Sequence, residues 1–203
     1  MSETRQIQHI CGQLERGEID NAQFLEQFAR ALVARIGCSR ASVWIFSGSS
    51  EARSMHCVAM YDATVDAMTT ATTPVVQGPA VAHYFDVMTR DGCVIAPDAL
   101  THAATSGIDD DYLRRSDVRS MLDVCFSVNG VLFGVFSCEQ IGQPVKWTSR
   151  QVQLLRHIAS RASLALLHAI PGESDTAPGP LWESSSPNRL ATMPMPLDPQ
   201  RKN

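Results

Sequence analysis

The sequence predicts an α+β fold, with helices laid over a central antiparallel sheet. Three observations support this: an apolar β-hairpin centred on 129–130, amphipathic helices at both ends, and the order of elements between them. The order is two helices, two strands, a variable middle with short helices, a hairpin and a long helix. At 203 residues and 44% hydrophobic content, the chain can bury one substantial core, so we expect a single domain with appendages.

Two helices are expected before the first strand. Apolar residues recur at helical spacing over 7–14, and Gly17 interrupts them. Asp20 then opens a second amphipathic helix with Gln23 three residues on, which is a capping-box arrangement. Gly37 is placed to end this helix as its C′ residue.

The variable middle follows a first hairpin and is predicted from shorter patterns. In chain order we first expect strands at 41–46 and 54–61 and a short edge strand at 74–76. A helix over 81–88 that ends near Gly92 and a strand at 93–96 should follow. A loop or short helical turn over 98–107 then leads to a helix opened by the acidic run 109–111. The last two of these segments, over 98–113, are where a lid over a pocket could form.

The segment 119–139 reads as two strands joined by Asn129-Gly130, a dipeptide that favours a type I′ turn. If the hairpin closes directly, Phe126 faces Phe133 and one side of the ribbon is almost wholly apolar. The other side then carries Met121, Asp123, Cys125 and Ser127 against Cys138, Phe136, Gly134 and Leu132. We expect this mixed face, with both thiols on it, to wall a pocket.

A long C-terminal helix is expected from Thr148, which stands three residues before Gln151 in a second capping box. Beyond Pro171 the chain is rich in Pro, Ser and Gly, which is typical of a disordered tail. We therefore expect an N-terminal helical extension over 1–19, a folded α+β domain over 20–168 and a disordered tail over 169–203.

Composition and charge exclude several classes of function. The formal charge of -4 and the pI near 5.8 argue against a nucleic-acid-binding surface. No stretch approaches the roughly 20 apolar residues of a membrane span, and no signal-peptide pattern opens the chain, so we expect a cytoplasmic protein. In that compartment six scattered cysteines are expected to be reduced and mostly buried.

Standard zinc, dinucleotide, P-loop and hydrolase motifs are absent from the sequence. We therefore assign no catalytic residues and no metal site, and the identity of any cofactor stays open. A haem iron would find a histidine at His83 or His102, although lone histidines seldom signify one.

Several segments together resemble the GAF domain family over about residues 20 to 168. They are Ala96-Pro97-Asp98-Ala99, the run Val118 to Val124, the run Asn129 to Val135, Glu139 to Gly142, and Trp147-Thr148. The resemblance implies a sheet of five or six antiparallel strands, with the terminal helices on one face and a small-molecule pocket under the middle segments on the other. It also implies dimerisation through the terminal helices.

The chain departs from particular branches of that family. Cys125 stands where many relatives have proline, and Gln140 where many have histidine. The bilin-attaching branch has a Cys-His dipeptide, which is absent here, so chromophore attachment is not expected. The Asn-Lys, Phe and Asp-Glu set of the cyclic-nucleotide-binding branch is not found either.

The resemblance and the mixed strand face lead to one set of predicted ligand-binding residues: His83, Tyr84, Phe85, Asp98, His102, Tyr112, Asp123 and Cys125. The leading hypothesis is a non-enzymatic, small-molecule-sensing regulatory module that acts in trans, through a dimer, on a separate signalling protein. The enzymatic alternative is a thiol-dependent reductase that resembles the free methionine-(R)-sulfoxide reductases and uses Cys93, Cys125 or Cys138. A third is a scaffold with a vestigial pocket.

Overall fold

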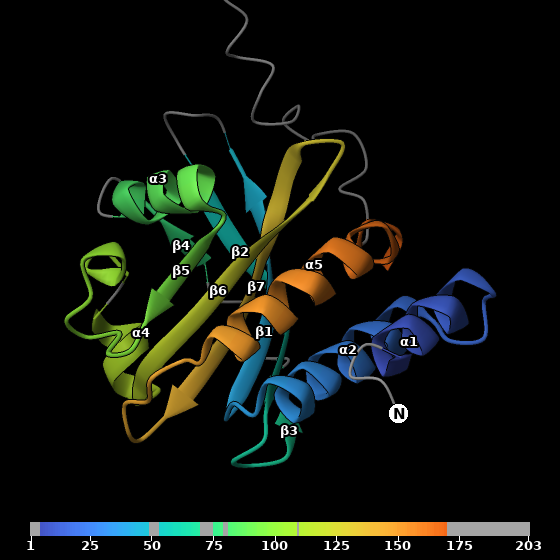
Figure 1. Cartoon of the computed structure of the whole chain (residues 1–203), viewed down its shortest axis with the longest axis horizontal. Helices are drawn as coiled ribbons and strands as arrows, with labels where there is room; N and C mark the ends of the chain where they lie inside the picture. The colour runs from blue at the N-terminus through green and yellow to red at the C-terminus, as the bar shows by residue number, and fades with distance from the viewer. Residues whose placement is uncertain (1–4, 49–52, 70–74, 79–80, 109, 170–203) are drawn as a thin grey trace, which may run out of the picture.

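A twisted antiparallel sheet forms the centre of the molecule (Figure 1). The computed structural model describes residues 5–48, 53–69, 75–78, 81–108 and 110–169. Six strands lie in the order β3-β2-β1-β7-β6-β5, and β4 pairs with β2 as well. The strands are β1 (Arg40–Ser47), β2 (Ser54–Asp62), β3 (Ala67–Met68), β4 (Val75–Gln77), β5 (Cys93–Ala96), β6 (Val118–Val128) and β7 (Val131–Ile141). The predicted α+β fold class is confirmed.

The helices begin and end where local sequence signals predict. They are α1 (Arg5–Glu15), α2 (Asn21–Ile36), α3 (Ala82–Asp91), the 3-10 turn η2 (Ala103–Thr105), α4 (Asp110–Arg115) and α5 (Ser149–Ala169). Asp20 and Gln23 form a complete capping box at the start of α2, and Gly37 ends it in the left-handed region with φ 74°. Thr148 and Gln151 repeat the reciprocal contacts at the start of α5.

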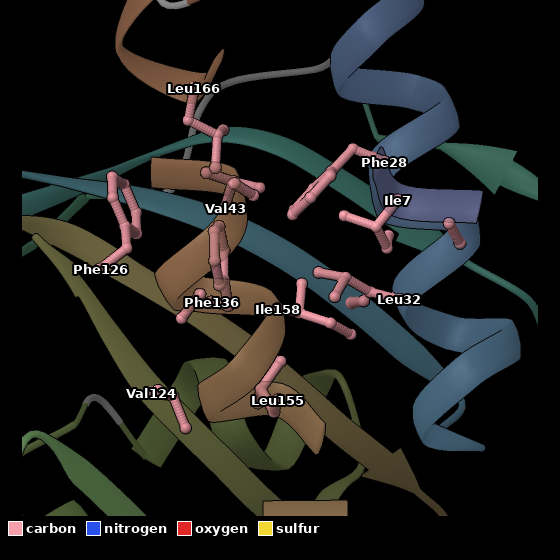
Figure 2. Close-up of a cluster of buried hydrophobic side chains, with 14 of the residues drawn as sticks. Ile7, Phe28, Leu32, Val43, Val124, Phe126, Phe136, Leu155, Ile158 and Leu166 are labelled. Atoms are coloured by element: carbon pink, nitrogen blue, oxygen red, sulfur yellow. The ribbon is translucent and has the colours of Figure 1, made fainter. Parts of the chain in front are cut away.

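Two layers of helices cover the two faces of the sheet (Figure 1). The terminal helices α1, α2 and α5 cover one face, where their apolar stripes bury Phe28, Leu32 and Ile158 against Phe126 and Phe136 of the sheet (Figure 2). The middle segments α3, η2 and α4 lie on the opposite face and make a second apolar cluster. The expected separation of terminal helices from pocket-side segments is therefore observed.

The hairpin turn at Asn129-Gly130 forms as predicted, with φ of 51° and 80°, but the predicted strand register is wrong beyond it. Ser127 pairs with Leu132 and Phe126 pairs with Gly134, so Phe133 is an extra, bulged residue. The bulge brings the glycine opposite the Phe126 ring, which lies 2.8 Å from where a Cβ on Gly134 would stand.

The one-residue shift exchanges the two faces of β7. Phe136 turns to the terminal helices and stacks on Phe126, with ring centroids 4.8 Å apart. Cys138 turns the same way and is fully buried in the first cluster. Ser137 and Glu139 take the opposite face, because they pair with Asp123 and Met121 of β6.

Among the described residues, no helix combines the length and apolarity that crossing a bilayer requires. The predicted tail lies almost wholly outside the described residues, as do Asp109 and the expected strand position 74.

Candidate functional site

A buried polar cluster lies on the sheet face beneath α3 and α4. The neighbouring strands β1, β7 and β6 place Arg40 beside Glu139 and Ser137 beside Asp123. All four of these side chains are almost completely buried, with exposed fractions between 1% and 6%. Buried charges are costly unless they are paired, so this concentration of polar groups in one place marks the site.

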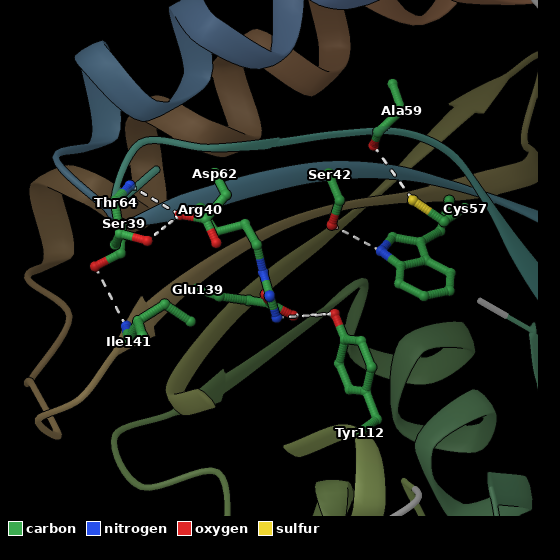
Figure 3. Close-up of polar contacts among 11 residues, drawn as sticks. Ser39, Arg40, Ser42, Cys57, Ala59, Asp62, Thr64, Tyr112, Glu139 and Ile141 are labelled. Atoms are coloured by element: carbon green, nitrogen blue, oxygen red, sulfur yellow. Dashed lines mark hydrogen bonds and ion pairs between the residues drawn. The ribbon is translucent and has the colours of Figure 1, made fainter. Parts of the chain in front are cut away.

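Glu139 accepts hydrogen bonds from two donors, one on β1 and one on α4 (Figure 3). Arg40 donates through Nε to Glu139 Oε2, and the Tyr112 hydroxyl donates to Oε1 at 2.8 Å. Arg40 Nη2 also donates to the Tyr112 hydroxyl, at 3.3 Å. Burial, and then the Glu139 carboxylate, raises the pKa of Tyr112 well above its ordinary value of 10, so its hydroxyl remains a neutral donor.

Asp123 forms one close hydrogen bond, and the Ser137 hydroxyl lies near enough to interact with its carboxyl group as well. The Tyr84 hydroxyl, on α3, donates to Asp123 Oδ2 at 2.7 Å. Asp123 Oδ1 and the neighbouring Ser137 Oγ are buried and form no well-aligned hydrogen bond among the described residues, although the Ser137 hydroxyl is close enough to Asp123 to lower its pKa. Burial raises the pKa of Asp123 to about 7, although the nearby Ser137 and Tyr84 hydroxyls act in the opposite direction.

The unpaired groups face a small cavity. Its volume is about 10 Å³, and its walls come from both the sheet and the covering segments: Trp44, Met55, Tyr84, Ile108, Tyr112, Met121, Asp123, Ser137 and Glu139. A space of that size holds about one water molecule. The void expected next to the hairpin exists, but side chains fill most of the volume that a drug-sized ligand needs.

Three of the eight predicted ligand-binding residues meet at this cavity: Tyr84, Tyr112 and Asp123. Of the others, His83 is exposed on α3, and Phe85 packs edge-on against Phe46, 5.4 Å away. Neither of these two lines the cavity.

The remaining three predicted residues also lie outside the cavity wall. Asp98 accepts from the Leu100 amide and lies 3.6 Å from an Arg119 nitrogen, so it stabilises a loop. His102 caps η2 by accepting from the Ala104 amide at 3.2 Å. Cys125 is half-buried beneath α3, with its sulfur 3.6 Å from the Met88 carbonyl oxygen.

Sequence reasoning missed most of the polar partners in the cluster. Arg40, Trp44, Ser137 and Glu139 were not predicted, and of these only Glu139 falls within a segment that resembles the family. A usable signal was present, since Arg40 and Glu139 are charged residues within otherwise apolar strands. Their pairing depends on strand register, which a single sequence does not reveal.

The thiols do not form a shared reactive face. The prediction that Cys125 and Cys138 lie on the same side is wrong, because the bulge at Phe133 turns Cys138 toward the terminal helices. Burial raises the pKa of Cys125 to about 12, and the pKa of Cys138 is raised well above 9 by its contact with Cys38 and by burial. Both are therefore protonated at neutral pH, and the reductase hypothesis loses its geometric support.

Within the part of the chain that the structure describes, no three His, Cys, Asp or Glu side chains come together as metal ligands would. The cluster instead offers hydrogen-bond acceptors, neutral tyrosine donors and one guanidinium. Such a set binds and orients a small polar group.

Solved structures with the same architecture include GAF domains of photoreceptors and of a phosphotransferase. A phycocyanobilin-bound GAF domain from a cyanobacterial phytochrome superimposes with a TM-score of 0.60 at 11% identity, covering 83% of this chain and 96% of that one. The GAF domain of an Acinetobacter phosphoenolpyruvate-protein phosphotransferase gives 0.59 at 14% identity, with coverage of 81% and 92%. The PixJ GAF domain of Thermosynechococcus elongatus gives 0.56 at 22% identity, with coverage of 83% and 90%.

These identities are low enough that the likeness shows the fold alone. No curated protein matches the sequence significantly. The sequence model of the GAF domain, however, matches residues 20–166, which is most of the chain and nearly all of the described sheet and helices. This chain therefore belongs to the GAF domain family.

Proposed function

We propose that this GAF domain is a non-enzymatic, small-molecule-sensing regulatory module that works inside the cell. The observation that carries the proposal is the pair of unpartnered buried groups, Asp123 Oδ1 and Ser137 Oγ, at a cavity between the sheet and the middle helices. An unsatisfied buried polar group costs about 1–3 kcal/mol, so a ligand that supplies the missing hydrogen bond stabilises the folded domain.

The size of the cavity limits the ligand. The phytochrome relative is named as binding phycocyanobilin, but a pigment of that size needs hundreds of cubic ångströms, against about 10 Å³ here. The chain also has no Cys-His dipeptide. A much smaller ligand, or a small group of a larger one, is the appropriate candidate.

The polar cluster is connected to the terminal helices, which provides a route for a signal. Arg40 follows the α2 terminator Gly37 by three residues and holds Glu139 at the cavity. Strand β6 carries Asp123 on the cavity face and packs its other face on α5. A ligand that moves Asp123 or Glu139 would therefore bias the packing of α2 and α5.

The same proposal gives the terminal helices a role in dimerisation and in signalling to a separate protein. Leu164 on α5 is 60% exposed, although its helix carries most of its apolar residues inward. Sedimentation velocity of the wild type and of Leu164→Glu would test the dimer, with Val65→Glu as the control because Val65 is 70% exposed in a turn. A wild type that sediments as a monomer at all concentrations would remove this part of the proposal.

Ligand binding is testable by thermal shift against a panel of amino acids, amines, organic acids and nucleotides. A true ligand should raise the melting temperature of the wild type and lose this effect in Asp123→Asn. Asp86→Asn is the matched control, since Asp86 is 70% exposed on α3 and lies away from the cavity. A panel with no stabilising compound, or one whose hits act equally on Asp123→Asn, would refute the assignment of the site.

A further inference from the structure

The cavity has more hydrogen-bond acceptors than donors. The Tyr84 hydroxyl is used on Asp123 Oδ2, and the Tyr112 hydroxyl is used on Glu139 Oε1. The indole N–H of Trp44 donates away from the cavity, to Ser42 Oγ at 2.8 Å. Asp123 Oδ1 and Ser137 Oγ are left without partners, at exposed fractions of 1% and 2%. An occupant that donates completes these contacts best, because the single Ser137 proton, even when it is turned toward Asp123, leaves acceptor lone pairs on both oxygens.

The charges and the aromatic rings around the cavity favour a cation. Asp123 and Glu139 supply two carboxylates, and Arg40 is the cation bonded to the cluster. When both carboxylates are ionised, the cluster therefore carries one net negative charge. Trp44, Tyr84 and Tyr112 also line the cavity, and aromatic faces attract cations.

We propose that the cavity is an ammonium site, which takes the protonated amino group of a small primary amine. The ammonium group donates to Asp123 Oδ1 and Ser137 Oγ, and its third N–H lies among the aromatic and methionine side chains. This inference rests on the proposed sensing function and names the ligand chemistry for the same site. At about 10 Å³, the cavity accepts a group the size of a water molecule without rearrangement.

Other cations fit the cluster less well. A quaternary ammonium has no N–H to donate to the two oxygens. A metal ion of the alkali or alkaline-earth type prefers six or more oxygen ligands, whereas two unpaired oxygens are offered here. A substituent on the ammonium nitrogen, methyl included, exceeds the cavity volume and is accepted by movement of Met55 and Met121, whose unbranched side chains repack readily.

Calorimetric titration of the full chain with methylammonium chloride at pH 8 tests the proposal. Potassium chloride and tetramethylammonium chloride at the same ionic strength serve as ion controls. We expect saturable binding of methylammonium, and no saturable binding of potassium or tetramethylammonium. Asp123→Asn should weaken it about 10- to 100-fold, because a charge-assisted hydrogen bond is lost, and Ser137→Ala about fivefold. Asp86→Asn should leave it unchanged.

Urea unfolding of each variant shows that a loss of binding is not a loss of fold. Absence of saturable methylammonium binding, an equal response to potassium, or unchanged binding by Asp123→Asn would each overturn the ammonium assignment. If a panel compound without an amino group binds the wild type and not Asp123→Asn, the assignment falls while the sensing function stands. If neither methylammonium nor any panel compound binds, both fall.

Discussion

Replacing Asp123 by asparagine should stabilise the unliganded protein at neutral and alkaline pH. Asparagine retains an oxygen that can accept from the Tyr84 hydroxyl, as Asp123 Oδ2 does at 2.7 Å. It removes the charge that a buried carboxylate must carry above its pKa, and its amide nitrogen can donate toward Ser137 Oγ, which now has no partner. Because the substitution keeps the shape of the side chain and removes its charge, it measures the cost of the buried charge by itself.

The pKa of Asp123 gives the size and the sign of the effect. Burial raises this pKa from its ordinary value of 3.8 to about 7. Below pH 4 the carboxyl group is neutral in both folded and unfolded chains. Between pH 4 and 7 only the unfolded chain releases the proton, so the wild type loses stability as the pH rises. Each unit of difference between the folded and unfolded pKa lowers the folding stability by about 1.4 kcal/mol. The wild type therefore loses at most about 4 kcal/mol of stability above pH 7.

Urea unfolding at several pH values between 4.5 and 8, followed by tryptophan fluorescence, measures this difference. The stability advantage of Asp123→Asn over the wild type should grow with pH and level off above 7. Other groups near Asp123 should contribute little to the difference, since Glu139 is present in both proteins, and the thiol of Cys125, with a pKa of about 12, and the Tyr84 hydroxyl stay neutral in this range. Asp86→Asn should show no such trend. An advantage that is constant with pH, or an asparagine variant that is less stable throughout, would refute the reasoning.

Three further predictions concern the hairpin, the buried ion pair and the thiols. Gly134→Ala should lower the free energy of unfolding by about 3 kcal/mol or more, because the added Cβ would stand 1.9 Å from the Trp44 carbonyl oxygen. Gly12→Ala in α1 is the control, since its Cβ meets only the flexible end of the Arg16 side chain. Urea unfolding of the two variants compares these effects. Glu139→Ala should cost about 3–5 kcal/mol by leaving Arg40 buried and unpaired, and Arg40→Met combined with Glu139→Leu should recover much of that loss in the same assay. Oxidation with diamide should give no Cys125–Cys138 disulfide by peptide mapping, and detection of that linkage would contradict the observed register.

Sequence patterns predicted the features that neighbouring residues decide. The capping boxes at Asp20 and Thr148 and the turn at Asn129-Gly130 depend on contacts within four residues, and each lies where expected. The amphipathic stripes of α2 and α5 likewise identified the core beneath them, because helical spacing alone assigns an inward face. The two-residue strand β3 gave no comparable signal and was not predicted.

The composition of the site was only partly predictable. Tyr84, Tyr112 and Asp123 were chosen from the middle helix and the mixed strand face, and they do converge at the cavity. Arg40 and Glu139 are 99 residues apart, and they meet only because β1 and β7 pair in one register. No local pattern contains that information.

The sequence by itself determined the caps of α2 and α5 and the hairpin turn, since these follow from short-range backbone preferences, and its match to the GAF domain model over residues 20–166 determined the family. Tertiary structure decided which side of β7 faces the cavity. The bulge at Phe133 places Gly134 opposite Phe126, whose ring occupies the space that a side chain at 134 would need. A single extra residue thereby moved Cys138 into the core and placed Ser137 and Glu139 beside Asp123, because side chains alternate along a strand.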